Sequence, residues 1–337
     1  MIVVRPVTTQ NHAEILALAK EAGIGFTSLP ADAGVLEAKI AHSVASFSGS
    51  AEEGRKESFL FVLEDTESGE LVGTTGIAAH VGMRQPFYSY KLSTIVQASK
   101  IVGVYSQQKV LHMVNDYTGA TEIGSLFLMP AYRRDGNGKF LSRARYLMLA
   151  EFPDMFSDVV IAEIRGMQDE QGHSPFYRNL AQHFFQMDFK HADFTNATKG
   201  GQFISDLMPK YPIYVNLLAE EAQAAIAQPF AASKPAMELL KKEGFRNQGY
   251  VDVFDAGPTM QAERSLIKSV RESRRRKVVA IGKPEGDKKY IISNTSLSNF
   301  RVVRDIMSVG EDGVTITEQT AANLMVEKGD AVRYVAA

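Results

Sequence analysis

The residues best suited to chemistry lie in one short turn between an apolar strand and an amphipathic helix. The turn follows Pro130 and reads Arg133-Arg134-Asp135-Gly136-Asn137-Gly138. An Arg-x-x-Gly-x-Gly turn at a helix start presents backbone N–H groups, the positive end of the helix dipole and two arginines to one point. Such a turn binds an anion, and we expect a pyrophosphate. The alternative is an ordinary turn that starts a helix.

The composition narrows the other possibilities. The chain has 337 residues with a net charge of −2, so bulk electrostatics favour neither nucleic acid nor a membrane as a partner. It holds no cysteine, which excludes disulfides, thiolate metal sites and a cysteine nucleophile, and we expect no metal. Residues 1–6 lack a signal-peptide pattern and no apolar run reaches membrane-spanning length, so we expect a cytoplasmic protein.

Hydrophobic periodicity predicts the elements that position the turn. In chain order they are a strand at 2–7, a helix capped by Thr8 or Thr9, a helix at 34–47, a hairpin of 58–63 and 71–79, strands within 87–104, a strand at 122–128, the glycine turn, a helix to about residue 150 and a buried strand at 159–164. A helix then follows Ser174-Pro175 and carries Phe176, Leu180, Phe184 and Phe185.

The order of these elements resembles that of the GNAT acyltransferase superfamily. The turn has a strand in front of it and lacks the Gly-Lys-Ser/Thr of a P-loop, so it looks like the acyl-CoA site of that superfamily. A later helix, 234–243, is stopped by Gly244 and followed by a strand at 250–254. That ending is typical of a GNAT domain and indicates either a degenerate second copy or a chance helix.

From about Ser273 the pattern changes to short β-type runs. They cover residues 277–281, 289–292, 300–303 and 331–335. The basic run Arg274-Arg275-Arg276-Lys277 could touch nucleic acid, but we interpret it as a solvated linker because the chain has so little net charge. We therefore predict a small C-terminal β domain.

Several motifs along the chain resemble one family, the arginine N-succinyltransferases. They are Gly25-Phe26-Thr27-Ser28-Leu29-Pro30, Asn115-Asp116-Tyr117-Thr118-Gly119, Gly136-Asn137-Gly138, Ser174-Pro175-Phe176, Leu207-Met208-Pro209-Lys210-Tyr211-Pro212-Ile213-Tyr214 and Phe254-Asp255-Ala256-Gly257-Pro258-Thr259. The resemblance implies an α+β, GNAT-like acyltransferase fold with two GNAT-like halves and a small C-terminal β domain. We place a GNAT-like acyl-CoA-binding domain at 1–200, a second degenerate segment at 201–265 and the β domain at 273–337.

The resemblance also implies an activity. It predicts transfer of a succinyl group from succinyl-CoA to the α-amine of L-arginine, in arginine degradation. Some relatives accept ornithine, and some work as two related subunits, so we expect a homo-oligomer or a hetero-oligomer with a paralogous subunit.

Family logic places the coenzyme along the strand that ends at Leu128. Leu126 matches the succinyl-CoA position of the family, and an N–H between Leu126 and Leu128 could face the thioester oxygen. Six further residues would surround the phosphates: Arg133, Arg134, Gly136, Asn137, Gly138 and Lys139. The alternative for the two arginines is simple exposure, and phosphate contact is favoured for Arg133.

The chain departs from the family at one position. The family carries a proton-transferring histidine where this chain has Phe230, within Gln228-Pro229-Phe230-Ala231. Because the substrate amine is mostly protonated near neutral pH, another base is needed. The candidates are Glu163, Tyr177 and His173, and the respective alternatives are a buried structural pair, core packing and a plain loop residue.

The substrate adds two demands. A guanidinium needs carboxylates, and Asp116, Asp169 and Glu170 are candidates in polar loops where solvation is the alternative. The succinyl carboxylate needs a cation or hydroxyls, which Arg165 and the Thr27-Ser28 pair could supply, although the pair could also cap the next helix.

Three hypotheses follow from the sequence. The first is a catalytic arginine N-succinyltransferase with a substitute for the missing histidine. The second is a non-catalytic, CoA-binding partner subunit of a paralogous enzyme. The third is an N-acyltransferase with a different amine acceptor or acyl donor.

Overall fold

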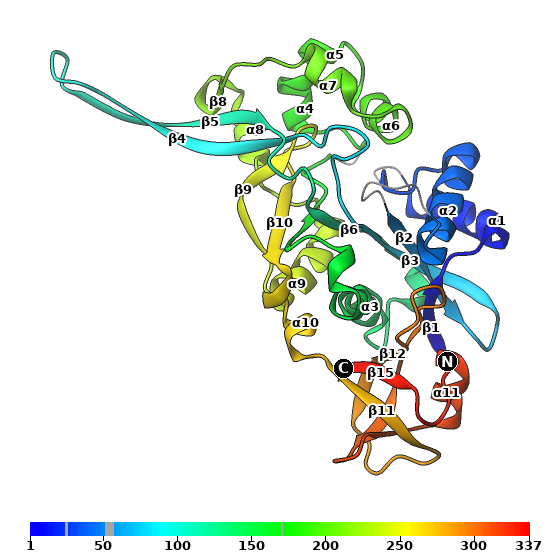
Figure 1. Cartoon of the computed structure of the whole chain (residues 1–337). Helices are drawn as coiled ribbons and strands as arrows, with labels where there is room; N and C mark the ends of the chain where they lie inside the picture. Colours follow the sequence, from blue (N-terminus) through cyan, green and yellow to red (C-terminus); the bar gives the residue numbers. More distant parts are fainter. Residues whose placement is uncertain (24–25, 51–56, 170) are drawn as a thin grey trace. The chain divides into compact units, whose positions relative to one another are not determined.

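The computed structural model describes residues 1–23, 26–50, 57–169 and 171–337. The chain divides into two compact units (Figure 1). The first unit contains Met1–His80, Thr121–Val160 and Glu263–Ala337, and the second contains Val81–Ala120 and Ile161–Ala262. Each is described here by itself. The domain boundaries predicted from the sequence stay a prediction.

An antiparallel sheet forms the centre of the first unit. Its strands are β1 (Ile2–Pro6), β2 (Ser58–Asp65), β3 (Glu70–Ala78) and β6 (Thr121–Leu128), in that spatial order. Helices α1 (His12–Ala22) and α2 (Ala33–Ser48) bury apolar residues such as Ile15 and Leu36 in one cluster with Leu60 and Phe127 of the sheet. Helix α3 (Asn137–Glu151) packs against β3 and β6.

The C-terminal strands of the first unit close on themselves. They are β11 (Arg274–Ile281), β12 (Lys289–Ser293), β13 (Val302–Val309), β14 (Val314–Ile316) and β15 (Ala331–Ala336). The pairing runs β12-β15-β11-β14-β13 and returns from β13 to β12, so each strand has two neighbours. Helix α11 (Glu318–Leu324) adds Leu324 to the apolar interior of this C-terminal ring. The basic run 274–277, interpreted from the sequence as a linker, is instead the start of β11, since residues 274–277 pair with residues 331–334.

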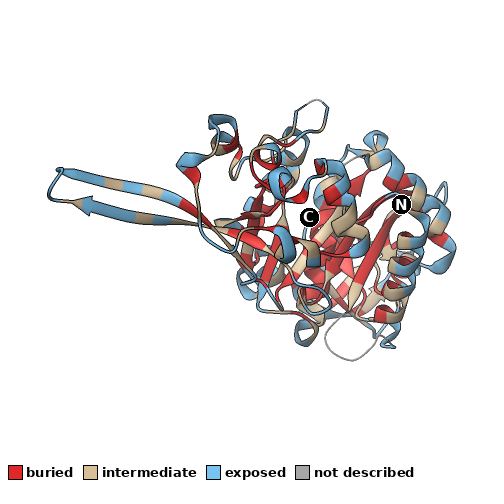
Figure 2. Cartoon of the chain, turned by 90° about the horizontal axis from the view of Figure 1, so that it is seen from above, coloured by how far each residue is buried: buried red, intermediate tan, exposed pale blue. Residues whose placement is uncertain are grey.

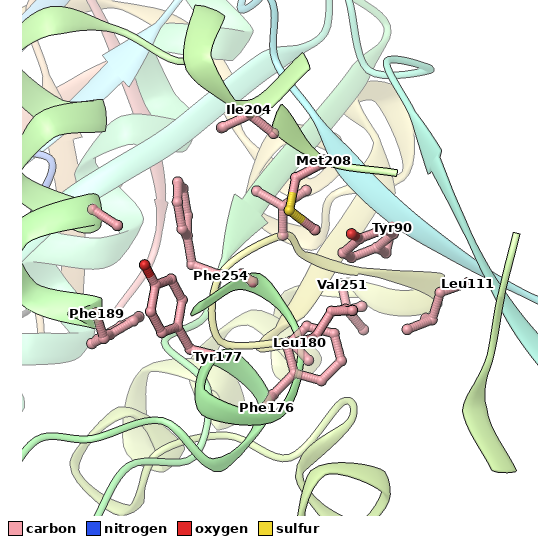
Figure 3. Close-up of a cluster of buried hydrophobic side chains, with 14 of the residues drawn as sticks. Tyr90, Leu111, Phe176, Tyr177, Leu180, Phe189, Ile204, Met208, Val251 and Phe254 are labelled. Carbon is pink, nitrogen blue, oxygen red and sulfur yellow. The ribbon is translucent and has the colours of Figure 1, made fainter. Parts of the chain in front are cut away.

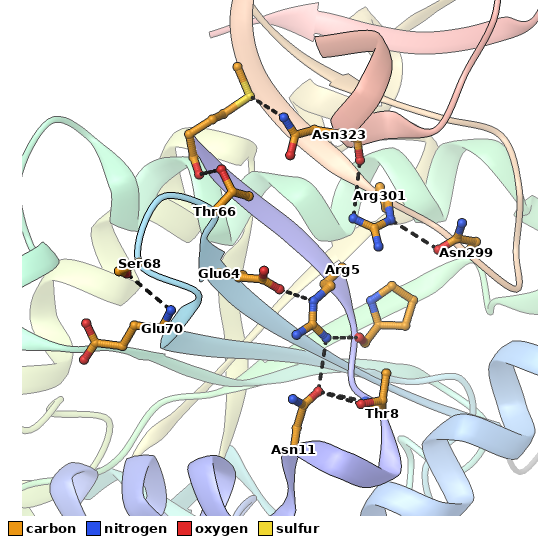
Figure 4. A network of polar contacts seen from close by, with 12 residues as sticks. Arg5, Thr8, Asn11, Glu64, Thr66, Ser68, Glu70, Asn299, Arg301 and Asn323 are labelled. Carbon is orange, nitrogen blue, oxygen red and sulfur yellow. Dashed lines mark hydrogen bonds and ion pairs between the residues drawn. The ribbon is translucent and has the colours of Figure 1, made fainter. Parts of the chain in front are cut away.

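Strand pairing at β1 joins the C-terminal ring to the rest of the first unit, and polar contacts lie on both sides of this junction. On strand β1, Arg5 contacts Glu64 and donates to Asn11 Oδ1 at 3.1 Å (Figure 4). Beside them, Arg301 donates to the backbone carbonyl of Asn323 at 3.4 Å. Strand β13 extends the sheet by pairing with β1 at Val303 and Val3. The ring is therefore part of the same compact unit as the glycine turn.

The second unit is built on a series of paired strands. In spatial order its strands are β7 (Val159–Glu163), β10 (Pro258–Glu263), β9 (Arg246–Asp252), β4 (Ser89–Ser99), β5 (Val104–Val114) and β8 (Ile213–Tyr214). Its helices are α4 (Pro175–Asn179), α5 (Ala181–Phe185), α6 (Phe189–Lys199), α7 (Gln202–Leu207), α8 (Glu220–Ala225) and α9 (Lys234–Glu243). A cluster of buried aromatic and aliphatic side chains joins the helices to the sheet, as in the packing of Phe176 against Tyr90 (Figure 3).

The β4–β5 hairpin extends beyond the two strands that pair with it. Residues 89–91 pair with β9 and residues 110–111 with β8, and within the described chain no other strand pairs with the remainder. The outer part is mostly exposed (Figure 2). Its apolar tip residues include Ile101, which is 97% exposed, and Tyr105, which is 65% exposed.

Two other local predictions were wrong. The helix predicted after Ser174-Pro175 is two short helices, because the backbone breaks at Leu180, and Phe184 is exposed rather than buried. Thr8 caps a single 3₁₀ turn, Thr9–Asn11, and α1 begins only at His12. None of the helices in the described parts of the chain is long and apolar enough to span a bilayer.

Candidate active site

A β-bulge lies in β6 just before its end. Gly76 pairs with Gly124 and Thr74 pairs with Phe127, so Ser125 and Leu126 together face the single residue Thr75. Ser125 has a φ of +51°, which is unusual for a residue with a side chain. A bulge takes one residue out of the ladder, and here the Ser125 carbonyl accepts the Thr74 hydroxyl at 2.8 Å. The family resemblance predicts a succinyl-CoA-binding position at Leu126, in this part of the strand.

The turn after β6 has open amides. Pro130–Tyr132 forms a 3₁₀ turn, and the N–H groups of Arg133 and Asn137 donate to the carbonyls of Pro130 and Arg134 at 3.1 and 3.0 Å. Asp135 and Gly136 both have positive φ, +53° and +72°. In the part of the chain that the structure describes, the N–H groups of Asp135, Gly136 and Gly138 have no hydrogen-bond partner. Three open amides beside the start of α3 are suited to an anion.

The two arginines of the turn differ. Arg133 donates from Nε to the Leu128 carbonyl at 2.9 Å, and its guanidinium lies 6.0 Å from the centre of the Phe127 ring. Arg134 is largely exposed and is 3.9 Å from Asp135, a contact that contributes little in water. Arg133 is therefore oriented by the strand end, whereas Arg134 is free to move in solvent. This difference favours Arg133 as the phosphate contact.

Asn137 fixes the shape of the turn. Its side chain is 5% exposed, donates to the Tyr132 carbonyl at 3.2 Å and accepts from Arg304 at 3.1 Å. Because both ends of the side-chain amide are used, and its backbone N–H donates to the Arg134 carbonyl, Asn137 holds the turn closed. The contact with Arg304 joins the C-terminal ring to the turn.

A lysine and a glutamate that the sequence did not single out face each other near the start of β6. Burial lowers the pKa of Lys39, and the negative charge of Glu122 opposes this shift. Burial also raises the pKa of Glu122, and the positive charge of Lys39 opposes that rise. Lys39 also donates to the Ser28 carbonyl at 3.1 Å. An isolated Glu in an apolar strand was the only signal in the sequence. Ser28 and Thr27 do not cap α2, since its cap is Asp32, which accepts from the Val35 N–H at 2.9 Å.

In the second unit, Arg165 forms ion pairs with two buried carboxylates. Its guanidinium lies 2.9 Å from Asp193 and 3.3 Å from Asp255. Burial alone would lower the pKa of Arg165, but the two carboxylates hold it above its ordinary value. The prediction that Arg165 binds a substrate carboxylate is thus replaced by a structural role, because its charge is already matched.

The segment after β7 and the segment 255–257 touch backbone to backbone. The N–H groups of Gly166 and Gly257 donate to the Asp255 carboxylate at 2.9 and 2.8 Å. A Cβ at Gly257 would lie 2.0 Å from the Ile164 carbonyl oxygen, so only glycine fits there. The sequence motif 254–259 therefore builds the core of this unit.

Tyr177 lies in the aromatic core of the second unit (Figure 3). It is 1% exposed, and its hydroxyl donates to the Met187 carbonyl at 3.1 Å. Burial and the charges of Asp188 and Asp193 raise its pKa. These contacts support core packing, the alternative to a proton donor.

His173 belongs to a tight loop with Asp169. Its Nδ1 lies 3.1 Å from Asp169 Oδ2, and the N–H groups of His173 and Gln171 donate to the other oxygen at 2.8 and 3.0 Å. These hydrogen bonds from His173 and Gln171 lower the pKa of Asp169. A carboxylate that orients an exposed imidazole is suited to proton transfer. Of the other guanidinium candidates, Glu170 lies outside the described residues, as does Gly25 of the first motif.

Glu163 and Asp116 lie near a pair of tyrosines. The rings of Tyr117 and Tyr250 are 4.6 Å apart, and the Tyr250 hydroxyl donates to Asp116 at 2.8 Å. Burial, followed by the charges of Tyr250 and Glu163, raises the pKa of Tyr117. Lys91 also lies 3.6 Å from Asp116. The Asp116 carboxylate is therefore already engaged.

With this geometry in place, the comparisons are decisive. The family model described as arginine N-succinyltransferase beta subunit matches residues 2–269, and the model of that subunit's C-terminal domain matches residues 274–336. The chain belongs to the arginine N-succinyltransferase family. The predicted family, the acyltransferase class and the α+β fold are confirmed.

Individual family members cover the whole chain. The arginine N-succinyltransferase of Yersinia enterocolitica is 42% identical over 337 residues, 99% of this chain and 97% of that protein. That of Escherichia coli strain 55989 is 40% identical with the same coverage. The solved structure of arginine/ornithine succinyltransferase subunit AI from Pseudomonas aeruginosa is 35% identical, has a TM-score of 0.90 and covers 100% of this chain and 98% of that one.

The residue at the family's expected histidine position lies beside the end of β7. The Phe230 N–H donates to the Arg165 carbonyl at 2.8 Å, and Pro229 forms a bridge with Gly166. Phe230 is therefore held two to three residues beyond Glu163 on a neighbouring segment. The arginine N-succinyltransferase fold keeps this position ordered although the histidine is absent.

The structure groups the predicted site residues into separate sets. One set lies in the first unit, at the end of β6 and in the turn after it: Leu126, Leu128, Arg133, Gly136 and Gly138. In the second unit, Glu163 and Phe230 surround the end of β7, and His173 pairs with Asp169. Across the described ranges, no three His, Asp or Glu side chains come together in a way that could hold a metal ion.

Proposed function

We propose that this chain transfers the succinyl group of succinyl-CoA to the α-amine of L-arginine. The observation that carries the proposal is the succession, within one short segment, of the bulge at Ser125-Leu126 and the turn with open amides at Asp135, Gly136 and Gly138. One part suits a thioester carbonyl and the other suits a diphosphate. Full-length relatives that are named arginine N-succinyltransferase support the choice of acyl group and acceptor.

The first unit would bind the donor. The open amides and Arg133 would bind the diphosphate, and strand β6 would pair with the pantetheine amides. An N–H of the bulge segment would donate to the thioester oxygen as negative charge develops there. The α-amine nitrogen then bonds to the carbonyl carbon, the C–S bond breaks and the thiolate of CoA leaves.

The reaction needs a base because the attacking amine must lose a proton. We assign this role to His173, since Asp169 binds Nδ1 of its ring and Nε2 is then the nitrogen that accepts a proton. Glu163 is the second candidate. Phe230 has no titratable group, and the structure supports a packing role for Tyr177.

One observation favours a second candidate function. Phe230 removes the proton-transferring group of the family, as expected for a CoA-binding partner subunit that has lost its own catalysis. Ornithine is a further candidate acceptor, because the Pseudomonas aeruginosa relative is named an arginine/ornithine succinyltransferase subunit.

Release of CoA thiol from succinyl-CoA, measured with arginine, with ornithine and with no acceptor, tests the proposal. We expect arginine-dependent release and one N-succinylarginine product by mass spectrometry. CoA binding without release under any condition would support the partner-subunit function. Release of CoA thiol with ornithine but not with arginine would show that ornithine, and not arginine, is the acceptor.

A further inference from the structure

The C-terminal ring places one arginine directly on the glycine turn. Arg304 lies in β13 and pairs across the ring with Ile291 of β12. Its Nη2 donates to Asn137 Oδ1 at 3.1 Å. A Cβ at Gly136 would lie 3.2 Å from its Nη1, so the guanidinium borders the backbone of the turn. The side chain therefore spans from the C-terminal ring to the first residues of α3.

This location is electrostatically unfavourable for a cation alone. The N-terminus of a 15-residue helix carries partial positive charge, which repels a guanidinium. Over the described ranges, no carboxylate lies within ion-pair distance of Arg304. Its neighbours are the neutral Asn137 amide and the Phe140 ring, 5.6 Å away. A cation held beside open amides becomes favourable when an anion binds between them.

We propose that Arg304 is a coenzyme-binding residue that contacts the phosphate groups of the CoA thioester. The assignment rests on the proposed function, because it takes the turn as the diphosphate site. The hydrogen bond to Asn137 uses one N–H of Nη2 and fixes the plane of the guanidinium. Its remaining donors, including those of Nη1 beside Gly136, are available for phosphate oxygens.

Side-chain contacts attach the ring to α3 and so hold Arg304 in place beside the turn. Arg143 of α3 donates to the Ala336 carbonyl at 2.8 Å, and Arg333 of β15 donates to Glu151 of α3 at 2.7 Å. The first contact lies at the middle of the helix and the second at its C-terminal end. Together they fix the position of the ring along α3. The C-terminal ring is thereby assigned a binding role as well as a packing role.

The test compares Arg304→Met with Arg276→Met. Both variants remove one positive charge from the C-terminal ring, but Arg276 is exposed on β11 and has no contact with the turn among the described residues. CoA affinity is measured by isothermal titration calorimetry, and steady-state rates are measured with succinyl-CoA and with succinyl-pantetheine, which has no phosphate. Thermal unfolding shows whether each variant is folded.

We expect Arg304→Met to weaken CoA binding by about 10- to 100-fold, as for the loss of a charged hydrogen-bonded contact. KM for succinyl-CoA should rise more than kcat falls. The kinetics with succinyl-pantetheine should match those of the unaltered protein. Arg276→Met should bind CoA normally, and Arg304→Lys should bind with intermediate affinity and a steeper loss in salt.

Two results would overturn the assignment. Unchanged CoA affinity in a folded Arg304→Met variant would remove Arg304 from the site. Equal losses with succinyl-CoA and succinyl-pantetheine would show that Arg304 only maintains the fold. Failure of the proposed function is separate, since it would appear as no CoA binding, or no acyl transfer, by the unaltered protein.

Discussion

Asp255 binds Gly166 across two crossing segments of the second unit: its Oδ2 accepts the Gly166 N–H at 2.9 Å. The same oxygen lies 3.3 Å from the guanidinium of Arg165, which also contacts Asp193. One buried carboxylate thus satisfies a backbone donor and a buried cation at the point where β7 ends. The segment that carries Glu163 and meets Phe230 depends on this contact for its position.

Loss of the Asp255 charge should destabilise the second unit. In Asp255→Ala, Arg165 keeps a single carboxylate and two backbone N–H groups lose their acceptor. We expect a loss of about 3–5 kcal/mol in the free energy of unfolding, measured by urea denaturation. Asp206→Ala, at an exposed carboxylate of α7, serves as the control and should change stability by less than about 0.5 kcal/mol. Equal stability of both variants would contradict the role given to Asp255.

The raised pKa of Asp252 should make the free energy of unfolding depend on pH. Burial and the Asp255 charge raise the pKa of Asp252 to about 8, whereas an unfolded aspartate titrates near pH 4. The folded protein therefore binds one more proton in that interval, and its free energy of unfolding should fall as pH rises from about 4 to about 8. Asp252→Asn keeps an oxygen for the Phe254 N–H and should flatten this decline. Parallel pH profiles for the two proteins would refute the shift.

Gly136→Val should weaken CoA binding strongly. Gly136 has a φ of +72°, and a side chain there would crowd Arg304 and the space above the open amides. We expect a loss of at least about 10-fold in CoA affinity, measured by calorimetry. Gly69→Val is the matched control, because Gly69 has a φ of +74° in the β2–β3 turn and no neighbour near its Cβ position. A similar loss in both variants would point to backbone strain alone.

His173→Gln should lower kcat with little change in CoA affinity. Removal of a general base costs about 10²–10⁴-fold in rate. Asp169→Asn should give a smaller loss, since the imidazole stays but its orientation is weakened. Full activity of His173→Gln would transfer the proton-accepting role to Glu163, which Glu163→Gln then tests.

Phe230→His introduces, beside the end of β7, the histidine that the family resemblance predicts at this position. If that position still faces the amine, the variant should gain rate, with a pH profile that follows an imidazole. Phe230→Tyr is the matched control, because it keeps the aromatic packing without a group that titrates near neutral pH. Identical rates for all three proteins would show that proton transfer takes place elsewhere.

The sequence predicted features that depend on local pattern. The glycine turn, the hairpin of β2 and β3 and helix α9 follow from periodicity and from residues such as Pro130 and Gly244. The bulge at Ser125 had no such signal, since serine is not typical of positive φ. The single helix predicted after Ser174-Pro175 was wrong because the backbone leaves the helical conformation at Leu180.

Site features that depend on contacts between distant segments were also missed, because a local pattern does not show such contacts. Arg304 lies 167 residues after Asn137 in the chain, and only the folding of the first unit brings the two together. Arg165 was one of the candidates for the succinyl carboxylate because its partners, Asp193 and Asp255, lie far along the chain. Pairing between charges in separate segments is invisible to periodicity.

The central claim is that the turn after β6 binds the diphosphate of a CoA thioester. A crystal structure of the protein with CoA tests this most directly. We predict that diphosphate oxygens lie within hydrogen-bond distance of the Gly136 and Gly138 N–H groups, with the pantetheine beside Leu126. CoA bound elsewhere, with the turn empty, would contradict the account.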